Sequence, residues 1–255
     1  MNTGELNELL VKLRLIQLRD SKKGVAVIDN GKVITSVGFG NTEYRSLPAG
    51  TDLTKMSEAA LVRLAHSVGI EKAGVFDKAD VYINGAGYSV KSLETAPPAL
   101  VNHTARPGWE RICAVLGVDI APLDEMIAEY WKLRKSGVLK EDVVNTDPNS
   151  PFAKNKEYLR PILNYFLFSG SGSKDSKHPA EYIFEFSDPL DTSTWSVGKD
   201  QYLNRHWDNL VFSLRSSKGM GNYPNIADAG KKRSMAKWTE FWQGGHKGAL
   251  HVRVK

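Results

Sequence analysis

The stretch DVYINGAGYSVK, from Asp80 to Lys91, decides the fold expected for this chain. Two short alternating runs flank Asn84-Gly85, and the Asn-Gly pair is a strong signal for a two-residue hairpin turn. If Asn84 and Gly85 form the loop, Asp80 faces Ser89, whereas a four-residue loop would place Asp80 opposite Lys91. Because side chains alternate along a strand, either register puts Asp80, Ser89 and Lys91 on one face.

The other face of the same hairpin is apolar and suits a core, with Val81, Ile83, Tyr88 and Val90. The polar face therefore holds a carboxylate close to an ammonium group. A carboxylate binds a hard divalent cation through oxygen, and such a metal polarises a phosphate and lowers the pKa of bound water. A lysine stabilises the charge that builds on phosphorus or helps to deprotonate the attacking water. The pattern predicts Mg²⁺-assisted phosphodiester hydrolysis; a solvated surface hairpin is the alternative.

Periodicity along the rest of the chain predicts an α/β fold. Helical spacing predicts helices over residues 4–19, 54–68, 107–116, 122–136 and 156–168. Alternation predicts a hairpin over residues 24–40 and strands over 181–186, 209–215 and the final ALHVRV segment. Trp238 and Trp242 lie at helical spacing, which favours core packing over base stacking. No linker separates two parts, so residues 1–255 are treated as a single domain.

Composition adds a moderate preference for an anionic partner. The formal net charge is +5, and residues 231–255 carry seven lysines and arginines with one acid. The single cysteine, Cys113, excludes a disulfide within the chain and a multi-cysteine zinc site. No signal peptide and no apolar run of about 20 residues is present, so no membrane association and a cytoplasmic location are expected.

The spacing of Asp80, eight further residues and then Ser89-Val90-Lys91 resembles the PD-(D/E)xK signature of restriction endonucleases and related nucleases. The resemblance implies a mixed central sheet of about five strands flanked by helices. It also implies that Asp80 is the metal-binding acid and Lys91 the catalytic lysine. Ala79 and Ser89 depart from the proline and the acid of the signature. A second acid is then expected from a neighbouring segment, and the candidates are, in order, Glu110, Glu58 and Glu94.

The resemblance implies a magnesium-dependent endonuclease that cuts double-stranded DNA, as a type II restriction enzyme does. The catalytic core elements are expected within about 54–120, and the C-terminal part should complete the sheet and contact DNA. A symmetric recognition site would favour a homodimer. The candidate DNA-binding residues are Asn102, His103, Arg106, Arg215, Lys218, Lys231, Lys232 and Arg233.

Three alternatives to a restriction enzyme remain open at the level of sequence. A non-catalytic DNA-binding protein predicts salt-sensitive binding without metal-dependent cleavage. A non-specific or repair nuclease predicts cleavage without discrete products. An enzyme that uses the glycine-rich loops to bind the phosphate of a small molecule predicts no affinity for duplex DNA.

Overall fold

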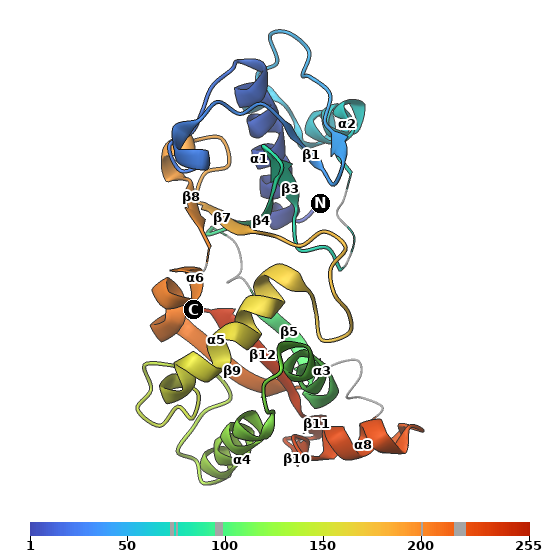
Figure 1. The fold of residues 1–255 in the computed structure, drawn as a ribbon, viewed down its shortest axis with the longest axis vertical. Coiled ribbons are helices and arrows are strands. Elements are labelled where there is room, and N and C mark those ends of the chain that lie inside the picture. Colours follow the sequence, from blue (N-terminus) through green and yellow to red (C-terminus); the bar gives the residue numbers. More distant parts are fainter. Residues whose placement is uncertain (72–73, 75, 95–98, 200, 217–222) are drawn as a thin grey trace. The chain divides into compact units, whose positions relative to one another are not determined.

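The computed structural model describes residues 1–71, 74, 76–94, 99–199, 201–216 and 223–255. The chain forms two compact units, and each unit is made of two separate segments (Figure 1). The first unit comprises Met1–Pro98 and Ser176–Lys199, and the second comprises Ala99–Asp175 and Asp200–Lys255. Because the segments interleave along the chain, no single linker divides it. This explains why the sequence, treated as one domain, shows no boundary.

A six-stranded mixed sheet forms the framework of the first unit, with the order β2-β1-β3-β4-β7-β8. Its strands are β1 (Val37–Phe39), β2 (Thr42–Glu43), β3 (Val81–Ile83), β4 (Ala86–Ser92), β7 (Tyr182–Phe186) and β8 (Ser196–Gly198). All neighbours are antiparallel except β4 and β7, which are parallel. The mixed α/β class expected from the sequence is confirmed. Two strands from residues 182–198 complete the first sheet, whereas the final strands belong to a second sheet.

Two helices accompany this sheet. Helix α1 (Thr3–Asp20) begins with a capping box between Asn2 and Glu5, and α2 (Glu58–Val68) is capped by the Ser57 side chain and ends at Gly69. Such caps satisfy backbone N–H groups that have no partner within the helix. The apolar side chains of both helices share one core with β3 and β4, including the four apolar hairpin residues that the alternation assigned to the buried face.

The hairpin of β3 and β4 has a two-residue turn, one of the two loop lengths that the sequence left open. Ile83 pairs with Ala86, and Asn84 and Gly85 both have positive φ, at 50° and 84°. The Asn84 carboxamide also binds a neighbouring segment: its Oδ1 accepts the N–H groups of Thr35 (2.8 Å) and Ser36 (3.3 Å). Asn84 therefore both forms the turn and ties it to the residues that lead into β1.

The hairpin predicted over residues 24–40 is wrong. Residues 24 and 33 form only an isolated bridge, and Asp29–Gly31 form a short 3-10 helix. Asp29 and Asn30 both have positive φ, a conformation outside the extended region, so the chain does not continue as two paired strands through this turn. The second half of this segment instead supplies β1, which pairs with β3. The alternating pattern of side chains indicated a strand in this segment, but it did not indicate that the strand pairs with β3.

The second unit is built on an antiparallel sheet with the order β5-β12-β9-β6. Its strands are β5 (Ala99–Ala105), β6 (Val143–Val144), β9 (Leu210–Arg215) and β12 (Ala249–Val254), and β10 (Glu240–Trp242) and β11 (Gly245–Lys247) form a separate pair. Its helices are α3 (Arg106–Leu116), α4 (Ala121–Lys135), α5 (Lys156–Asn164), α6 (Gln201–His206) and α8 (Ala229–Ala236). The predicted helix over 156–168 continues past α5 as a π-helix, Tyr165–Ser169.

Two local expectations in this unit need correction. Periodicity predicted no strand around Asn102 and His103, but this segment lies within strand β5. Trp238 is completely buried, as the core interpretation predicts, whereas Trp242 lies in strand β10 rather than on a helix. None of the helices in the described part of the chain is both long and apolar enough to cross a membrane.

The turn gives a direct test of the role of Asn84. We expect Asn84→Ala to lower the free energy of unfolding by about 2 kcal/mol, because it removes hydrogen bonds to backbone groups and places alanine at positive φ. Asn30→Ala is the matched control: Asn30 also has positive φ (54°), but its side chain is exposed and hydrogen-bonds to no described residue. Denaturant unfolding followed by circular dichroism measures both, and equal losses would contradict the bracing role.

Candidate functional site

Asp80 lies directly before β3 and is held on the hairpin by its own side chain. Its Oδ2 accepts the backbone N–H of Val90 at 2.7 Å and the hydroxyl of Ser89 at 3.3 Å. Its backbone N–H donates to the carbonyl of Tyr88 at 2.8 Å. Both carboxylate bonds use Oδ2, and no described residue hydrogen-bonds to Oδ1. The carboxylate is therefore fixed in position with one oxygen left for another ligand.

Lys91 follows Ser89 by two residues on β4, so both side chains leave the strand on the same face. Strand β7 runs parallel to β4 and brings Glu185 into register with Lys91. Glu185 is only 4% exposed, while Lys91 is partly exposed. Glu185 was not predicted as a site residue, although its strand was, because pairing between residues about 95 positions apart has no local signal.

Helix α1 adds a buried ion pair beside this hairpin. The Lys12 Nζ atom lies 2.6 Å from Oε1 of Glu8, and Lys12 is only 2% exposed. Burial and the negative charge of Asp80 raise the pKa of the Glu8 carboxyl, whereas Lys12 and Lys91 act to lower it. The carboxylates of Glu8 and Asp80 are thus close enough to repel each other. A cation bound near both would relieve that repulsion.

A third lysine, Lys78, stands two residues before Asp80. Burial lowers the pKa of its ammonium to about 8, with a further contribution from the positive charge of Lys91, while Asp80 opposes the shift. Its backbone N–H donates to the carbonyl of His178 at 3.0 Å and to Ser176 Oγ at 3.1 Å. Segment 176–178 thereby positions Lys78, and Asp80 is accompanied by two lysines rather than the single one predicted.

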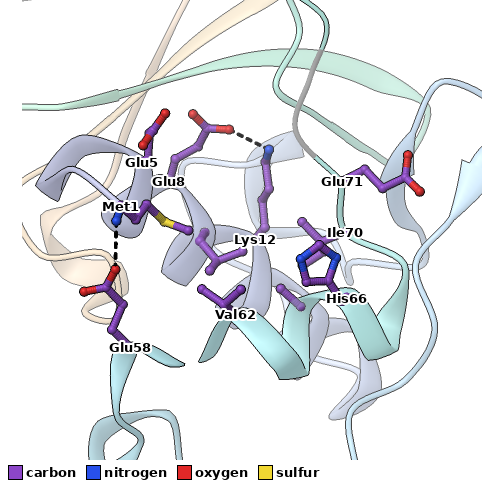
Figure 2. A pocket seen from close by; sticks show the side chains of 11 residues that line it. Met1, Glu5, Glu8, Lys12, Glu58, Val62, His66, Ile70 and Glu71 are labelled. Atoms are coloured by element: carbon purple, nitrogen blue, oxygen red, sulfur yellow. Dashed lines mark hydrogen bonds and ion pairs between the residues drawn. The ribbon is translucent and has the colours of Figure 1, made fainter. Parts of the chain in front are cut away.

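A cavity of about 470 Å³ lies between α1 and α2, and Glu8 and Lys12 form part of its wall (Figure 2). It is lined by Met1, Glu5, Glu8, Leu9, Lys12, Glu58, Val62, Ala65, His66, Ile70 and Glu71. Glu58, one of the predicted second acids, lines the same cavity but pairs with the amino group of Met1 at 3.1 Å. The charge of Asp80 raises the pKa of the Glu8 carboxyl in the same wall.

The other predicted second acids are placed as follows. Glu94 is exposed just beyond β4. Glu110 lies on α3 in the second unit, where its carboxylate pairs with Arg106 at 3.0 Å and accepts a hydrogen bond from Ser234 at 2.7 Å. Among the residues with described positions, no three histidine, cysteine or acidic side chains gather as a ready-made metal cage.

Arg106, predicted to contact DNA, is instead a structural residue. It is 2% exposed and forms a two-pronged ion pair with Asp124, at 2.7 and 2.8 Å. It also donates to Ser234 at 2.8 Å. These bonds join α3, α4 and α8, and a guanidinium so deeply buried is not available to a duplex. The burial of Arg106 could not be predicted from the sequence, because the residues that enclose it are distant in the chain.

The other predicted DNA-binding residues lie in the second unit or outside the described residues. Asn102 and His103 are on β5, and Arg215 is at the end of β9. Lys231, Lys232 and Arg233 belong to α8, where the first and last are exposed. Lys218 falls outside the described residues.

A histidine pair in the same unit was not predicted. The ring of His103 stacks on that of His251, on β12, with 4.6 Å between centroids and 20° between planes. Burial lowers the pKa of His251 to about 4, and the positive charges of His103, Arg215 and Arg253 act in the same direction. The buried imidazole is therefore neutral at physiological pH.

The chain matches no protein-family model, no curated protein and no solved structure. The chemistry of the site in the first unit is accordingly the basis for a functional assignment.

The Glu8–Lys12 pair gives a prediction on stability. We expect Lys12→Met to lower the free energy of unfolding by about 2 kcal/mol, because it leaves the partly buried Glu8 carboxylate without its buried cation. Lys55→Met is the control, since Lys55 is 82% exposed in its pair with Asp52, and exposed pairs contribute about 0–1 kcal/mol. Denaturant unfolding at pH 7 compares the two variants; similar losses would contradict a distinctive role for the buried pair.

The pKa of His251 gives a prediction on pH dependence. The folded-state pKa, about 4, lies below the unperturbed value of 6.5. The neutral ring therefore contributes its full stability above pH 6.5, and this contribution is lost as the pH falls toward 4. We expect His251→Phe, which keeps a flat ring against His103, to reduce the loss of stability between pH 6.5 and 4. Denaturant unfolding curves across that pH range test this, with His66→Phe, at an exposed histidine, as the control. If the free energy of unfolding of His251→Phe falls with pH as steeply as that of the wild type, the prediction is overturned.

Proposed function

We propose that this chain is a Mg²⁺-dependent endonuclease that hydrolyses phosphodiester bonds of double-stranded DNA, and more specifically a type II restriction enzyme. The observation that carries the proposal is the placement of Asp80. Its carboxylate is fixed opposite Ser89, on the same hairpin as Lys91 and beside the Glu8 carboxyl of α1. Acid and ammonium groups so arranged are the parts that metal-assisted attack on a phosphate requires.

The donor atoms fit a magnesium ion. Mg²⁺ prefers oxygen ligands and usually binds through one or two carboxylates, with water and substrate phosphate oxygens completing its shell. Asp80 and Glu8 provide two carboxylates whose charges repel in the absence of a cation. When bound, the metal supplies a polarised phosphate oxygen and a water of lowered pKa.

The residues of the chain have separate roles in this proposal. Asp80 and Glu8 hold the cation, and the hydrogen bonds from Val90 and Ser89 keep the Asp80 carboxylate from rotating. Lys91 stabilises the negative charge that builds on the phosphate oxygens during attack. Lys78 adds a second positive charge near Asp80. Ser89, which stands where the signature has an acid, orients Asp80 rather than binding metal.

The proposal revises the source of the second acid. Glu8 belongs to the same unit as Asp80 and interacts with it electrostatically, whereas Glu58 pairs with the amino group of Met1. Glu110 belongs to the other unit and is engaged by Arg106 and Ser234. We therefore assign the helper role to Glu8, a residue of the first helix that sequence spacing did not single out.

A plasmid cleavage assay tests the proposal. We expect the purified protein to cut plasmid DNA with Mg²⁺ and not with a chelator. Asp80→Asn and Lys91→Met should each lower the cleavage rate by about two orders of magnitude or more, as loss of a group acting in the transition state does. Circular dichroism should show both variants folded, and binding of DNA in the chelator should be largely retained.

Matched variants distinguish the roles of Glu8 on α1 and Glu58 on α2. Glu8→Gln should reduce cleavage strongly, whereas Glu58→Gln, at the same cavity, should leave the rate within severalfold of the wild type. Undiminished cutting by Asp80→Asn, or an absence of Mg²⁺-dependent cutting by the wild type, would overturn the proposed function.

The products of the same assay distinguish the remaining alternatives. Discrete bands would support the restriction enzyme, and a smear would support a non-specific or repair nuclease. Salt-sensitive binding without any cutting would support a non-catalytic DNA-binding protein.

A further inference from the structure

A row of polar side chains crosses one face of the four-stranded sheet in the second unit. Ser213 on β9 pairs in register with His251 on β12, and the His103 ring of β5 stacks on His251. On the far side, Asp142 directly precedes β6, whose Val143 pairs with Phe212. The alternate residues of β9 and β12, such as Phe212 and Leu250, are fully buried in the apolar interior. The polar row lies on the opposite face of the sheet, where Ser213 and His251 are also buried, at 0% and 8% exposure, and the arginines at the ends of the strands reach the surface.

Asp142 holds two arginines side by side. Its Oδ1 accepts from Arg215 Nη2 at 2.7 Å, and its Oδ2 accepts from Arg253 Nη2 at 3.0 Å. Arg215 also donates from Nε to Ser213 at 3.0 Å. The side chains of the two arginines remain 34% and 24% exposed. Because a guanidinium has five N–H donors, each arginine keeps donors for an external anion in a fixed orientation.

The surroundings of the clamp are positive overall. Next to Asp142, Glu141 pairs with Lys247 at 2.7 Å and, more distantly, with Arg134 at 3.9 Å. The group thus contains four cations, Arg134, Arg215, Lys247 and Arg253, and two acids, Glu141 and Asp142. The surplus of positive charge favours a polyanion at this face.

Two further features point to a ligand at the histidine pair. The Nδ1 atom of His251 is buried, and no described residue hydrogen-bonds to it. His103 has a φ of 40°, at an irregularity in the pairing of β5 with β12. A bulge re-aims a side chain, and strain and an unpaired buried polar atom are each expected where a structure is organised for binding.

We propose that the part of this row that reaches the surface, formed by His103, Arg215 and Arg253 and braced by Asp142, binds the phosphate backbone of duplex DNA. The binding residues lie on three neighbouring strands, β5, β12 and β9, and so span about 10 Å, given a strand spacing of about 4.8 Å. Phosphates of one DNA strand are about 3.4 Å apart along the duplex axis, so several can face the row. The inference rests on the proposed function for the choice of DNA as the polyanion.

Binding of a fluorescent duplex, measured by anisotropy in a chelator, tests this face without cleavage. We expect Arg215→Gln and Arg253→Gln together to weaken binding by about tenfold or more, and to lower the slope of log affinity against log salt by about one for each arginine. Arg160→Gln is the matched control, because Arg160 is a partly exposed arginine of the same unit, paired with Glu157. Wild-type affinity in the double variant would overturn the proposal.

Two more variants separate a built site from a mere excess of charge. Asp142→Asn removes a negative charge, so an unorganised patch would bind DNA more tightly, whereas release of the two arginines from their clamp should weaken binding severalfold. His103→Phe keeps the ring stack on His251 but removes the nitrogen atoms of the partly exposed ring, and should also weaken binding. Tighter binding by Asp142→Asn would contradict the clamp. Thermal unfolding of each variant confirms that it is folded at the assay temperature.

The design keeps the two proposals distinguishable. If the wild type binds DNA through this face but never cuts it with Mg²⁺, the proposed hydrolysis fails while the binding face stands. If Mg²⁺-dependent cutting is observed but the double variant binds as the wild type does, the nuclease stands and the assignment of this face is overturned.

Discussion

The two-residue turn at Asn84 and Gly85 is the constraint on which the candidate site depends. A strand shifted by one residue presents the opposite set of side chains, so the length of this turn decides whether Asp80 faces Ser89 or the core. Positive φ at both turn residues and the bonds from Asn84 to Thr35 and Ser36 fix that register. With the register set, the apolar face packs against α1 and the polar face holds acid and ammonium groups together.

Long-range contacts then complete the site. Strand β7 pairs in parallel with β4 and brings Glu185 level with Lys91. Helix α1 contributes the buried Lys12 and its partner Glu8. The carboxylates of Glu8 and Asp80 therefore interact electrostatically, although they are about 70 residues apart in the chain. The site is thus a local hairpin supplemented by elements from both ends of the first unit. A buried charge without a counter-ion is energetically costly, so the buried Lys12 ammonium requires the Glu8 carboxylate beside it.

The sequence predicted the parts of this molecule that are governed by local rules. Most helices, the presence of the hairpin and the strand ending at Phe186 follow from spacing, capping and turn residues, whereas the sequence left the hairpin register open between two loop lengths. The roles of Glu8 and Glu185 could not be predicted, because they depend on pairing across the chain. Arg106 appeared to be a DNA contact for the same reason: nothing near it in sequence reveals Asp124 and Ser234 around it. The division into interleaved units was equally hidden, since no linker marks it.

The interleaving has a consequence for biosynthesis. A ribosome releases the chain from its N-terminus, so β4 emerges long before β7, the strand that pairs with its outer edge. Until then the nascent first unit has an open sheet edge while the intervening part of the second unit is being made. Unpaired edges of this kind attract other chains. The last step in the first unit's maturation is therefore the docking of a late segment, and translation speed through residues 99–175 sets how long the edge stays exposed.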